Sequence, residues 1–341
     1  MTNPQLSCRI CSAIDSHPIF VGREMMFGTR ETFKYFQCTS CGCLQISDIP
    51  QDLGRFYPPG YYSLTVPNSE RTSPLRAFLL KQRFRNAIFG QGYKVNQLLS
   101  NSVDMPDLRV DTVLPVANVL QEAGIRDFSA RFLDIGCGSW SLWLANLRTM
   151  GFQRLFGADP FITADTTCDG ITIYKRQVSE MEGSFDLITF HHSLEHIPDQ
   201  QGVLAAARRL LAPNGVILVR IPVTSSYAWH HYGTNWVEMD PPRHLYLHSR
   251  ESIRLLAEKT GLHLYATICD SLDLEFYGSE QYLRDIPLTA KNSYWLNHDN
   301  EIFTQSEIEG FRDMARGVNE RNECGRACFF LRPTIENRSE P

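Results

Sequence analysis

The stretch Arg131-Phe-Leu-Asp-Ile-Gly-Cys-Gly-Ser-Trp-Ser141 decides the fold class, because a short apolar run breaks there into a turn and then into a helix-like segment. The turn carries Gly136 and Gly138. Since glycine has no Cβ atom, both residues let the backbone turn sharply and let a ligand approach it closely. The helix that follows offers unpaired N–H groups. The stretch therefore predicts the first strand and the nucleotide-binding loop of a Rossmann-like sheet.

Strand-like and helix-like runs alternate along the rest of the chain. In order, they are 132–135, 142–150, 154–158, 171–174, 186–190, 202–211, 216–221, 252–260 and 262–268. Such alternation predicts an α/β fold, with a parallel sheet, helices on both faces and right-handed crossovers. Ligands bind at the carboxyl ends of the strands in sheets of this kind. We expect Asp134, Gly136, Asp159 and the segment 191–196 at those ends.

Two C-x2-C pairs lie near the N-terminus. Cys8-Arg-Ile-Cys11 and Cys38-Thr-Ser-Cys41 are separated by 26 residues, and Cys43 is left over. Four thiolates on two turns give the closed tetrahedral site that structural Zn²⁺ prefers, so the spacing predicts a small zinc ribbon. Four reduced cysteines without a metal are the alternative. Because no secretory signal precedes them, we expect the ten cysteines to be thiols or metal ligands and not disulfides.

Several short motifs follow one another in the predicted core. They are Leu133-Asp-Ile-Gly-Cys-Gly138, Asp159 at a strand end, Phe185-Asp-Leu-Ile188, Leu194-Glu-His196 and Leu211-Ala-Pro-Asn-Gly215. This order resembles the class I S-adenosylmethionine-dependent methyltransferases. The resemblance implies a last strand at 326–332, antiparallel to 262–268. It also implies S-adenosylmethionine as cofactor, with the ribose at the strand-end acid, the methionine half over the glycine turn, and cofactor contacts from Asp134, Gly136, Gly138, Asp159, Pro160, His191 and Glu195.

The cysteine pairs and the proline- and tyrosine-rich connector 45–63 narrow the resemblance to methyltransferases of bacterial sugar and polysaccharide modification. This implies a sugar, a polysaccharide precursor or a similar hydroxylated small molecule as the acceptor, methylated on oxygen or carbon. In the sugar C-methyltransferases of this group a histidine after the fifth strand is the base, which matches His244, and His192 is the second catalytic candidate. Arg243 replaces a glutamate of those enzymes and suits an anionic acceptor. Tyr277 lies in a long insertion and is a further candidate acceptor contact.

One residue departs from the family pattern, one histidine is given a structural role, and one alternative function stays open. Trp140 stands where the family pattern Asp-x-Gly-x-Gly-x-Gly has its third glycine, at the methionine end of the cofactor. His196, in the turn after the fourth strand, is interpreted as structural. The alternative function is a binding or scaffold protein that keeps the fold without catalysis.

The chain divides into five predicted segments. They are a zinc-binding domain with its connector at 1–63, a helical linker at 64–112, the cofactor-binding core at 113–274, a substrate lid at 275–323, and a final strand and tail at 324–341.

A helix of basic and apolar residues is expected at 75–99. It either packs on the core or touches a membrane, and its interruption by Gly90 and Gly92 favours packing.

Composition limits the classes of partner. The formal net charge of −5 and the pI near 6.1 argue against a surface built to bind nucleic acid. No apolar run of about 18 residues is present, which argues against stable membrane insertion. The start of the chain lacks a basic and then apolar signal region, so we expect a cytoplasmic protein that acts on a small-molecule or glycan acceptor. The sequence leaves the oligomeric state open.

Overall fold

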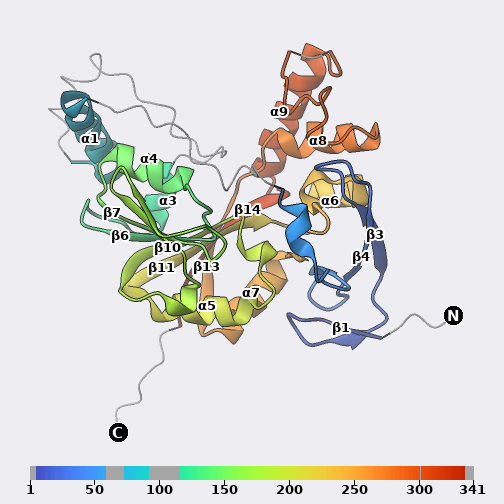
Figure 1. The fold of residues 1–341 in the computed structure, drawn as a ribbon, viewed down its shortest axis with the longest axis horizontal. Coiled ribbons are helices and arrows are strands. Elements are labelled where there is room, and N and C mark those ends of the chain that lie inside the picture. Colours follow the sequence, from blue (N-terminus) through green and yellow to red (C-terminus); the bar gives the residue numbers. More distant parts are fainter. Residues whose placement is uncertain (1–4, 59–72, 92–115, 300, 335–341) are drawn as a thin grey trace, which may run out of the picture.

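An eight-stranded sheet forms the centre of the molecule (Figure 1). The structure is a computed structural model that describes residues 5–58, 73–91, 116–299 and 301–334. In spatial order the strands are β13 (Leu262–Cys269), β14 (Arg326–Pro333), β11 (Leu211–Pro222), β10 (Phe185–His191), β6 (Arg131–Ile135), β7 (Arg154–Ala158), β9 (Ile171–Tyr174) and β8 (Thr166–Cys168).

The middle of this sheet is parallel and its edges are antiparallel. Strands β11, β10, β6, β7 and β9 pair in parallel. Strand β14 runs antiparallel between β11 and β13, and β8 runs antiparallel to β9. The predicted Rossmann-like α/β fold is confirmed, and the last strand pairs with β13 as expected.

Each face of the sheet is covered by its own layer of helices. Successive strand residues point to opposite faces, so a strand that is apolar throughout presents apolar side chains to both layers. In β14, Phe329 and Leu331 belong to one hydrophobic cluster, together with Leu204 and Ile253 from two helices of that face. Phe330, between them, belongs to the other cluster. The first face carries α5 (Gln200–Arg209) and α7 (Arg250–Lys259), and the second carries α1 (Pro74–Phe89), α3 (Val116–Glu122) and α4 (Leu142–Met150) (Figure 1).

For helix α1 in the linker, the sequence left two alternatives open, which were packing on the core and contact with a membrane. Leu80, Phe84 and Ile88 are buried in the cluster that it shares with α3 and α4, so the helix packs on the core. It ends at Phe89, just before Gly90 at φ +65°. The other linker residues, 64–72 and 92–112, lie outside the described residues. No helix of the described ranges is both long and apolar enough to span a membrane.

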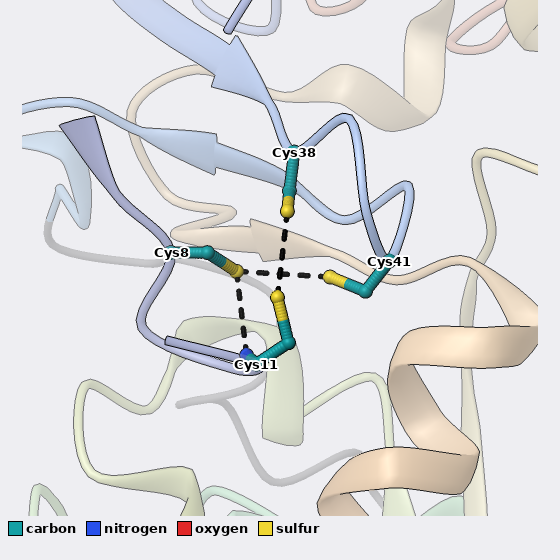
Figure 2. Close-up of side chains that lie close together, drawn as sticks. All are labelled: Cys8, Cys11, Cys38 and Cys41. Atoms are coloured by element: carbon teal, nitrogen blue, oxygen red, sulfur yellow. Dashed lines mark hydrogen bonds between the residues drawn. The ribbon is translucent and has the colours of Figure 1, made fainter. Parts of the chain in front are cut away.

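The N-terminal segment forms two small sheets. Strands β1 (Leu6–Ser7) and β2 (Ile14–Asp15) make a hairpin that carries the first cysteine pair. A four-stranded sheet has the order β12, β5, β4 and β3. Its strand β12 (Tyr246–Leu247) comes from the core domain, after β11 in the chain. Its other strands are β3 (Ile19–Arg23), β4 (Thr32–Gln37) and β5 (Leu44–Ile46). The two turns bring the four predicted zinc ligands together (Figure 2).

The segment between β13 and β14 contains two helices that the sequence reading missed, α8 (Leu274–Leu283) and α9 (Gln305–Glu320). Thr304 caps α9 by accepting a hydrogen bond from the amide of Glu307, whose carboxylate accepts from the amide of Thr304. This Thr-x-x-Glu capping box was the available signal. The buried side chains Ile308, Phe311, Ala315 and Val318 give the helix its apolar face.

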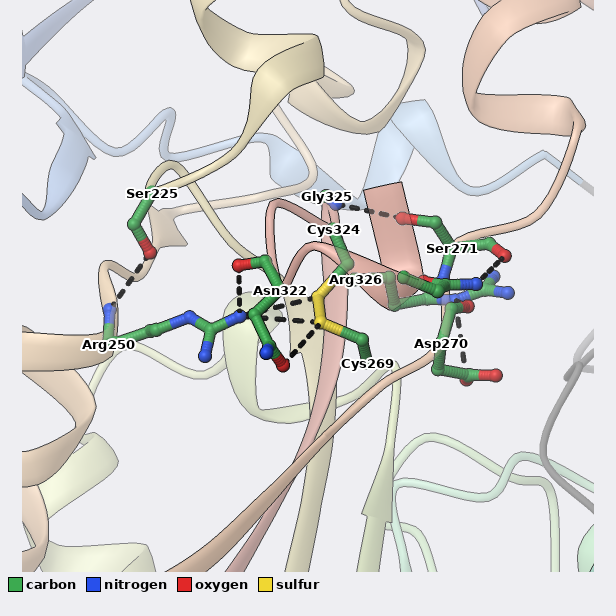
Figure 3. The surroundings of a disulfide bond; sticks show 10 residues. Ser225, Arg250, Cys269, Asp270, Ser271, Asn322, Cys324, Gly325 and Arg326 are labelled. Carbon is green, nitrogen blue, oxygen red and sulfur yellow. Dashed lines mark hydrogen bonds and ion pairs between the residues drawn. A yellow bond between two sulfur atoms is a disulfide. The ribbon is translucent and has the colours of Figure 1, made fainter. Parts of the chain in front are cut away.

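A disulfide bond joins Cys269 at the end of β13 to Cys324 just before β14 (Figure 3). It closes the base of the α8 and α9 segment. Nη2 of Arg250 lies beside the pair and donates to the carbonyl of Asn322 at 2.8 Å. The expectation that all ten cysteines are thiols or metal ligands is wrong for these two, because the topology places them side by side although 55 residues separate them in sequence.

The remaining short elements connect these layers. They are α6 (Tyr227–Tyr232) and the 3-10 helices η1 (Leu53–Phe56), η3 (Val178–Glu180), η4 (Leu194–His196), η5 (Gly233–Asn235) and η6 (Val237–Met239).

Candidate functional site

The glycine turn lies at the carboxyl end of β6. Gly136 and Gly138 have φ angles of +70° and +65°, where a residue with a Cβ atom is strained. A Cβ atom on Gly136 would lie 2.6 Å from Cβ of Ser193, in the segment after β10. The hydroxyl of Ser193 donates to the carbonyl of Ile135 at 2.7 Å. The turn is therefore held close against the segment that follows β10.

Asp159 follows β7 and is fixed beside this turn. Its Oδ2 accepts a hydrogen bond from the amide of Gly138 at 2.9 Å, and its Oδ1 accepts from the amide of Phe161 at 2.8 Å. Pro160, between Asp159 and Phe161 in the chain, is partly buried. Each carboxylate oxygen has a further lone pair. The arrangement suits a ligand that presents two hydroxyl donors, as a ribose does.

Asp134 lies on the inner side of the turn and is almost fully buried. Its two oxygens accept hydrogen bonds from the hydroxyls of Ser141 at 2.6 Å and Thr189 at 2.7 Å. Burial raises the pKa of Asp134 to about 6. Ser141 also caps α4 by accepting from the amide of Leu144 at 3.1 Å. Asp134 thus ties strand, turn and helix together, and its predicted contact with the cofactor stays a prediction.

Trp140, the residue that departs from the family pattern, is partly buried and packs against the apolar cluster under α4. Part of the indole is therefore used in core packing.

Two histidines follow at the end of β10. Both ring nitrogens of His191 are buried without a hydrogen-bond partner among the described residues, and its ring packs 4.9 Å from that of Trp143. Burial, helped by the charge of Arg220, lowers the pKa of His191 to about 3. Burial likewise lowers the pKa of His192, a residue in the left-handed region at φ +49°. Both imidazoles are therefore neutral near pH 7.

A group of four side chains, which we call the histidine cluster, lies next to this segment. Its members are His192, Glu195, His196 and His244. Oε1 of Glu195 lies 3.4 Å from Nδ1 of His192 and 3.9 Å from Nε2 of His244. The rings of His196 and His244 meet edge-on with centroids 4.7 Å apart. The cluster brings together the two catalytic candidates, His192 and His244. It also contains Glu195, which is predicted as a cofactor contact, and His196, which is interpreted as structural.

Glu195 is the most confined member of the histidine cluster. The side chain is fully buried, and neither carboxylate oxygen has a hydrogen-bond partner among the described residues. Burial raises the pKa of Glu195 well above its ordinary value. Burial also lowers the pKa of His196 to about 3. Such a group can hold a proton, a cation or a polar ligand between its members.

The segment that carries His244 is held by the N-terminal part of the chain. The hydroxyl of Tyr35 in β4 donates to the carbonyl of His244 at 2.8 Å. The amide of Leu245 donates to the carbonyl of Glu195 at 2.9 Å. Just before this segment, Pro241 and Pro242 are joined by a cis peptide bond. The N-terminal sheet therefore fixes one side of the histidine cluster.

Arg243 has partners other than the predicted acceptor. It is fully buried, and its guanidinium donates to Asp240 at 2.5 and 2.8 Å, to Glu24 at 2.9 Å and to the carbonyl of Phe56 at 3.3 Å. The two carboxylates raise its pKa further above the ordinary value. Arg243 thus ties the His244 segment to the N-terminal part of the chain, and we correct its assignment from acceptor contact to this structural role.

Tyr277 lies in α8 and is buried, with its ring packed edge-on against that of Tyr294 at 5.1 Å. Helix α8 covers η6, where the hydroxyl of Ser279 accepts from the amide of Val237 at 3.0 Å. The predicted lid segment therefore packs onto the core, and an acceptor contact from Tyr277 stays a prediction.

The four predicted zinc ligands meet between two turns (Figure 2). Sγ of Cys8 lies 3.6 Å from that of Cys41, and Sγ of Cys11 lies 3.5 Å from that of Cys38. Sulfurs bound tetrahedrally to Zn²⁺ lie about 3.8 Å apart, because each bond is about 2.3 Å long. The contact between Cys8 and Cys41 lowers the pKa of the first thiol to about 4 and raises that of the second well above its ordinary value. Burial raises the pKa of Cys43, which lies outside the group.

Comparison with known families identifies one part of the chain. Residues 110–267 match the family model described as a methyltransferase domain. These residues include the glycine turn, Asp159 and the whole histidine cluster. Helices α8 and α9 and strand β14 lie beyond the match.

Curated relatives match shorter stretches. The ubiquinone biosynthesis O-methyltransferase of Methylococcus capsulatus is 35% identical over 96 residues, which are 25% of this chain and 40% of the relative. The protein of the same name from Xanthomonas oryzae pv. oryzae is 28% identical over 130 residues, which are 34% of this chain and 53% of that protein. The chain thus spans about half the length of these relatives or less.

Solved structures give weaker likenesses. A putative sarcosine dimethylglycine methyltransferase from Galdieria sulphuraria is 16% identical with a TM-score of 0.40, over 64% of this chain and 84% of that one. The cyclopropane synthase MmaA2 from Mycobacterium tuberculosis is 15% identical with a TM-score of 0.39, over 77% of this chain and 99% of that one.

Proposed function

We propose that the protein is an S-adenosylmethionine-dependent methyltransferase that transfers the methyl group to a hydroxyl oxygen of a small molecule. The observation that carries this proposal is the Gly136 to Gly138 turn closed onto the Asp159 carboxylate, within the residues that match a methyltransferase domain. An oxygen acceptor is favoured over carbon because the curated relatives are named O-methyltransferases. A sugar or polysaccharide precursor is the narrower candidate for the acceptor.

The residues at the turn fit the cofactor. Both glycines have positive φ angles and carry no Cβ atom, so the backbone is bare where the methionine half would lie. Asp159 can accept from the two ribose hydroxyls. The two nitrogens of His191, which have no hydrogen-bond partner among the described residues, are polar groups that a bound cofactor could meet. When bound, S-adenosylmethionine supplies an electrophilic methyl carbon on a sulfonium. Asp159, the glycine turn and His191 are the residues that would hold and orient it.

The histidine cluster supplies the proton chemistry. In the transfer, the acceptor oxygen forms a bond to the methyl carbon while the carbon–sulfur bond breaks, and the hydroxyl proton must leave. Nδ1 of His244 lies 2.7 Å from the carbonyl of Glu238, which can only accept, so the lone pair is on Nε2. That lone pair faces Glu195 and is placed to take the proton. Positioning by the buried walls supplies much of the remaining rate.

Two measurements test this function in sequence. Calorimetry and thermal shift with S-adenosylmethionine and S-adenosylhomocysteine should show binding to the purified protein. Methyl-labelled cofactor is then offered with two acceptor panels, one of nucleotide sugars and one of hydroxylated aromatic compounds, and labelled product is counted. Protein that binds neither form of the cofactor would contradict the proposal and favour the scaffold alternative.

A further inference from the structure

We propose that Glu195, His196 and His244 form a centre for one divalent metal ion, separate from the four-cysteine group. The existence of the centre does not depend on the proposed function, whereas its role in transfer rests on it.

The distances suit a metal ion. One ligand atom from each of the three side chains lies within 4.8 Å of the others. Two ligands bound tetrahedrally at about 2.1 Å lie about 3.4 Å apart. The observed 3.9 Å from Nε2 of His244 to Oε1 of Glu195 therefore needs a contraction of about half an ångström.

The hydrogen bonds of the two imidazoles orient their lone pairs. Nδ1 of His244 lies 2.7 Å from the carbonyl of Glu238, and Nδ1 of His196 lies 2.9 Å from the carbonyl of Arg243. A carbonyl cannot donate, so each Nδ1 carries the proton and each Nε2 has a free lone pair. Metal-bound histidines are held in this way, with the second ring N–H on a backbone carbonyl.

Glu195 adds the negative charge. Both of its oxygens are buried without a hydrogen-bond partner among the described residues. Nε2 of His244, which is also an acceptor, lies 3.9 Å away, too far for a direct hydrogen bond. Unpaired acceptors that converge in a buried space are costly. A cation beside the two Glu195 oxygens removes this cost, and the two Nε2 lone pairs can bind the same ion.

The ligand types define the class of ion. Two imidazoles and one carboxylate suit Zn²⁺, Fe²⁺ or Co²⁺, whereas Mg²⁺ and Ca²⁺ prefer oxygen ligands. Three protein ligands leave a position open, as in catalytic sites and unlike the closed four-sulfur group. An acceptor hydroxyl bound there would lose its proton to water more readily. When the metal ion is bound, the Nε2 lone pair of His244 would serve as a metal ligand and not as the proton acceptor, and the ion would promote the loss of the proton.

Metal titration of the full chain tests the centre without cofactor or acceptor. Protein treated with a mild chelator, and shown by circular dichroism to remain folded, is titrated with Co²⁺, whose thiolate complexes show strong sulfur-to-metal charge-transfer bands. Zn²⁺ content is measured in parallel, so that the occupancy of the four-cysteine group is known. We expect one Co²⁺ equivalent that lacks the thiolate bands. In Glu195→Gln, affinity for this equivalent should fall at least tenfold while any thiolate signal stays. Glu275→Gln, which alters another buried carboxyl outside the cluster, is the matched control and should keep the affinity.

A second variant guards against misfolding. His196→Gln should also lose the equivalent, with circular dichroism used to check that each variant is folded. Wild-type protein that binds no Co²⁺ outside the thiolate site, or a folded Glu195→Gln variant that binds it unchanged, would overturn the centre. Metal binding without cofactor binding would instead contradict only the proposed function, and methyl transfer by protein without this equivalent would contradict only the centre's role in transfer.

Discussion

Gln45 of β5 pairs with Tyr246 of β12, and its side-chain amide donates to Sγ of Cys8 at 2.8 Å. One residue therefore joins the cysteine group to the strand that begins two residues after His244. Because β12 belongs to the N-terminal sheet, the predicted zinc domain is part of the wall of the histidine cluster. Disturbing the cysteine group should reach the acceptor side of the site and spare the cofactor side.

Cys38→Ser tests this coupling. Wild-type protein made with zinc present should carry one equivalent of thiolate-bound metal, and the variant should lose it together with folding stability, because a structural metal contributes to the free energy of folding. Methyl transfer should fall while affinity for the cofactor persists. Metal analysis, chemical denaturation and calorimetry measure the three quantities. Cys168→Ser, outside the group, is the control. Wild-type protein without such a metal would sink the zinc assignment.

Asp159→Ala should weaken cofactor binding by about one to two decades, because a charged hydrogen-bonded contact contributes about 1.5–3 kcal/mol. Titration calorimetry with S-adenosylmethionine measures the change. Asp165→Ala, a little further along the chain, removes a carboxylate whose Oδ1 accepts from the amide of Lys175 and should leave affinity unchanged. Equal affinity in both variants would remove Asp159 from the cofactor site.

His244→Ala should lower kcat by about 10²–10⁴ with cofactor affinity intact, because the variant lacks either the proton acceptor or a metal ligand. Steady-state kinetics on an identified acceptor, with calorimetry for the cofactor, measure both. His263→Ala, on an exposed position of β13, is the control. A variant that keeps kcat and only raises the KM for the acceptor would assign His244 to acceptor binding.

Arg243→Leu should destabilise the protein by about 3–5 kcal/mol, since it leaves two carboxylates, Asp240 and Glu24, without their buried partner. Chemical denaturation measures the free energy of unfolding. Arg254→Leu, which breaks ion pairs on the surface of α7, should change stability little. An Arg243 variant of normal stability with a raised KM would restore the acceptor role predicted from the sequence.

The pH dependence of stability should show the buried His248. Its ring bonds the hydroxyl of Ser252 at 2.8 Å and the side chain of Gln200 at 2.9 Å, and burial lowers its pKa to about 3. The unfolded chain, with a histidine pKa of about 6.5, then binds the proton first as the pH falls. Stability from this residue is present above pH 6.5 and declines toward pH 3, by about 2 kcal/mol between pH 7 and pH 5.

His248→Gln isolates this effect from that of the other buried histidines. Between pH 6 and pH 4 the free energy of unfolding of the variant should change with pH by about one proton less than that of the wild type. Denaturation series at several pH values give both slopes. Identical slopes would show that His248 titrates normally in the folded protein.

The sequence by itself determined the core sheet and its cofactor edge. The alternation of apolar strands and helices, with glycines 136 and 138 after the first strand, depends on local periodicity and on backbone freedom, both of which can be read from neighbouring residues. For the same reason the two C-x2-C pairs identified their own cluster. The signals for helix α9 are equally local, since its capping box and its apolar spacing lie within the segment itself.

Only the tertiary structure decided the composition of the histidine cluster. His196 and His244 are 48 positions apart, and they meet because β12 leaves the core to join the N-terminal sheet. The same crossing buries Arg243 between Asp240 and Glu24 and so changes its role. The disulfide between Cys269 and Cys324 likewise depends on two adjacent strands. Such contacts between distant segments follow from strand order and packing, which no local pattern of residues specifies.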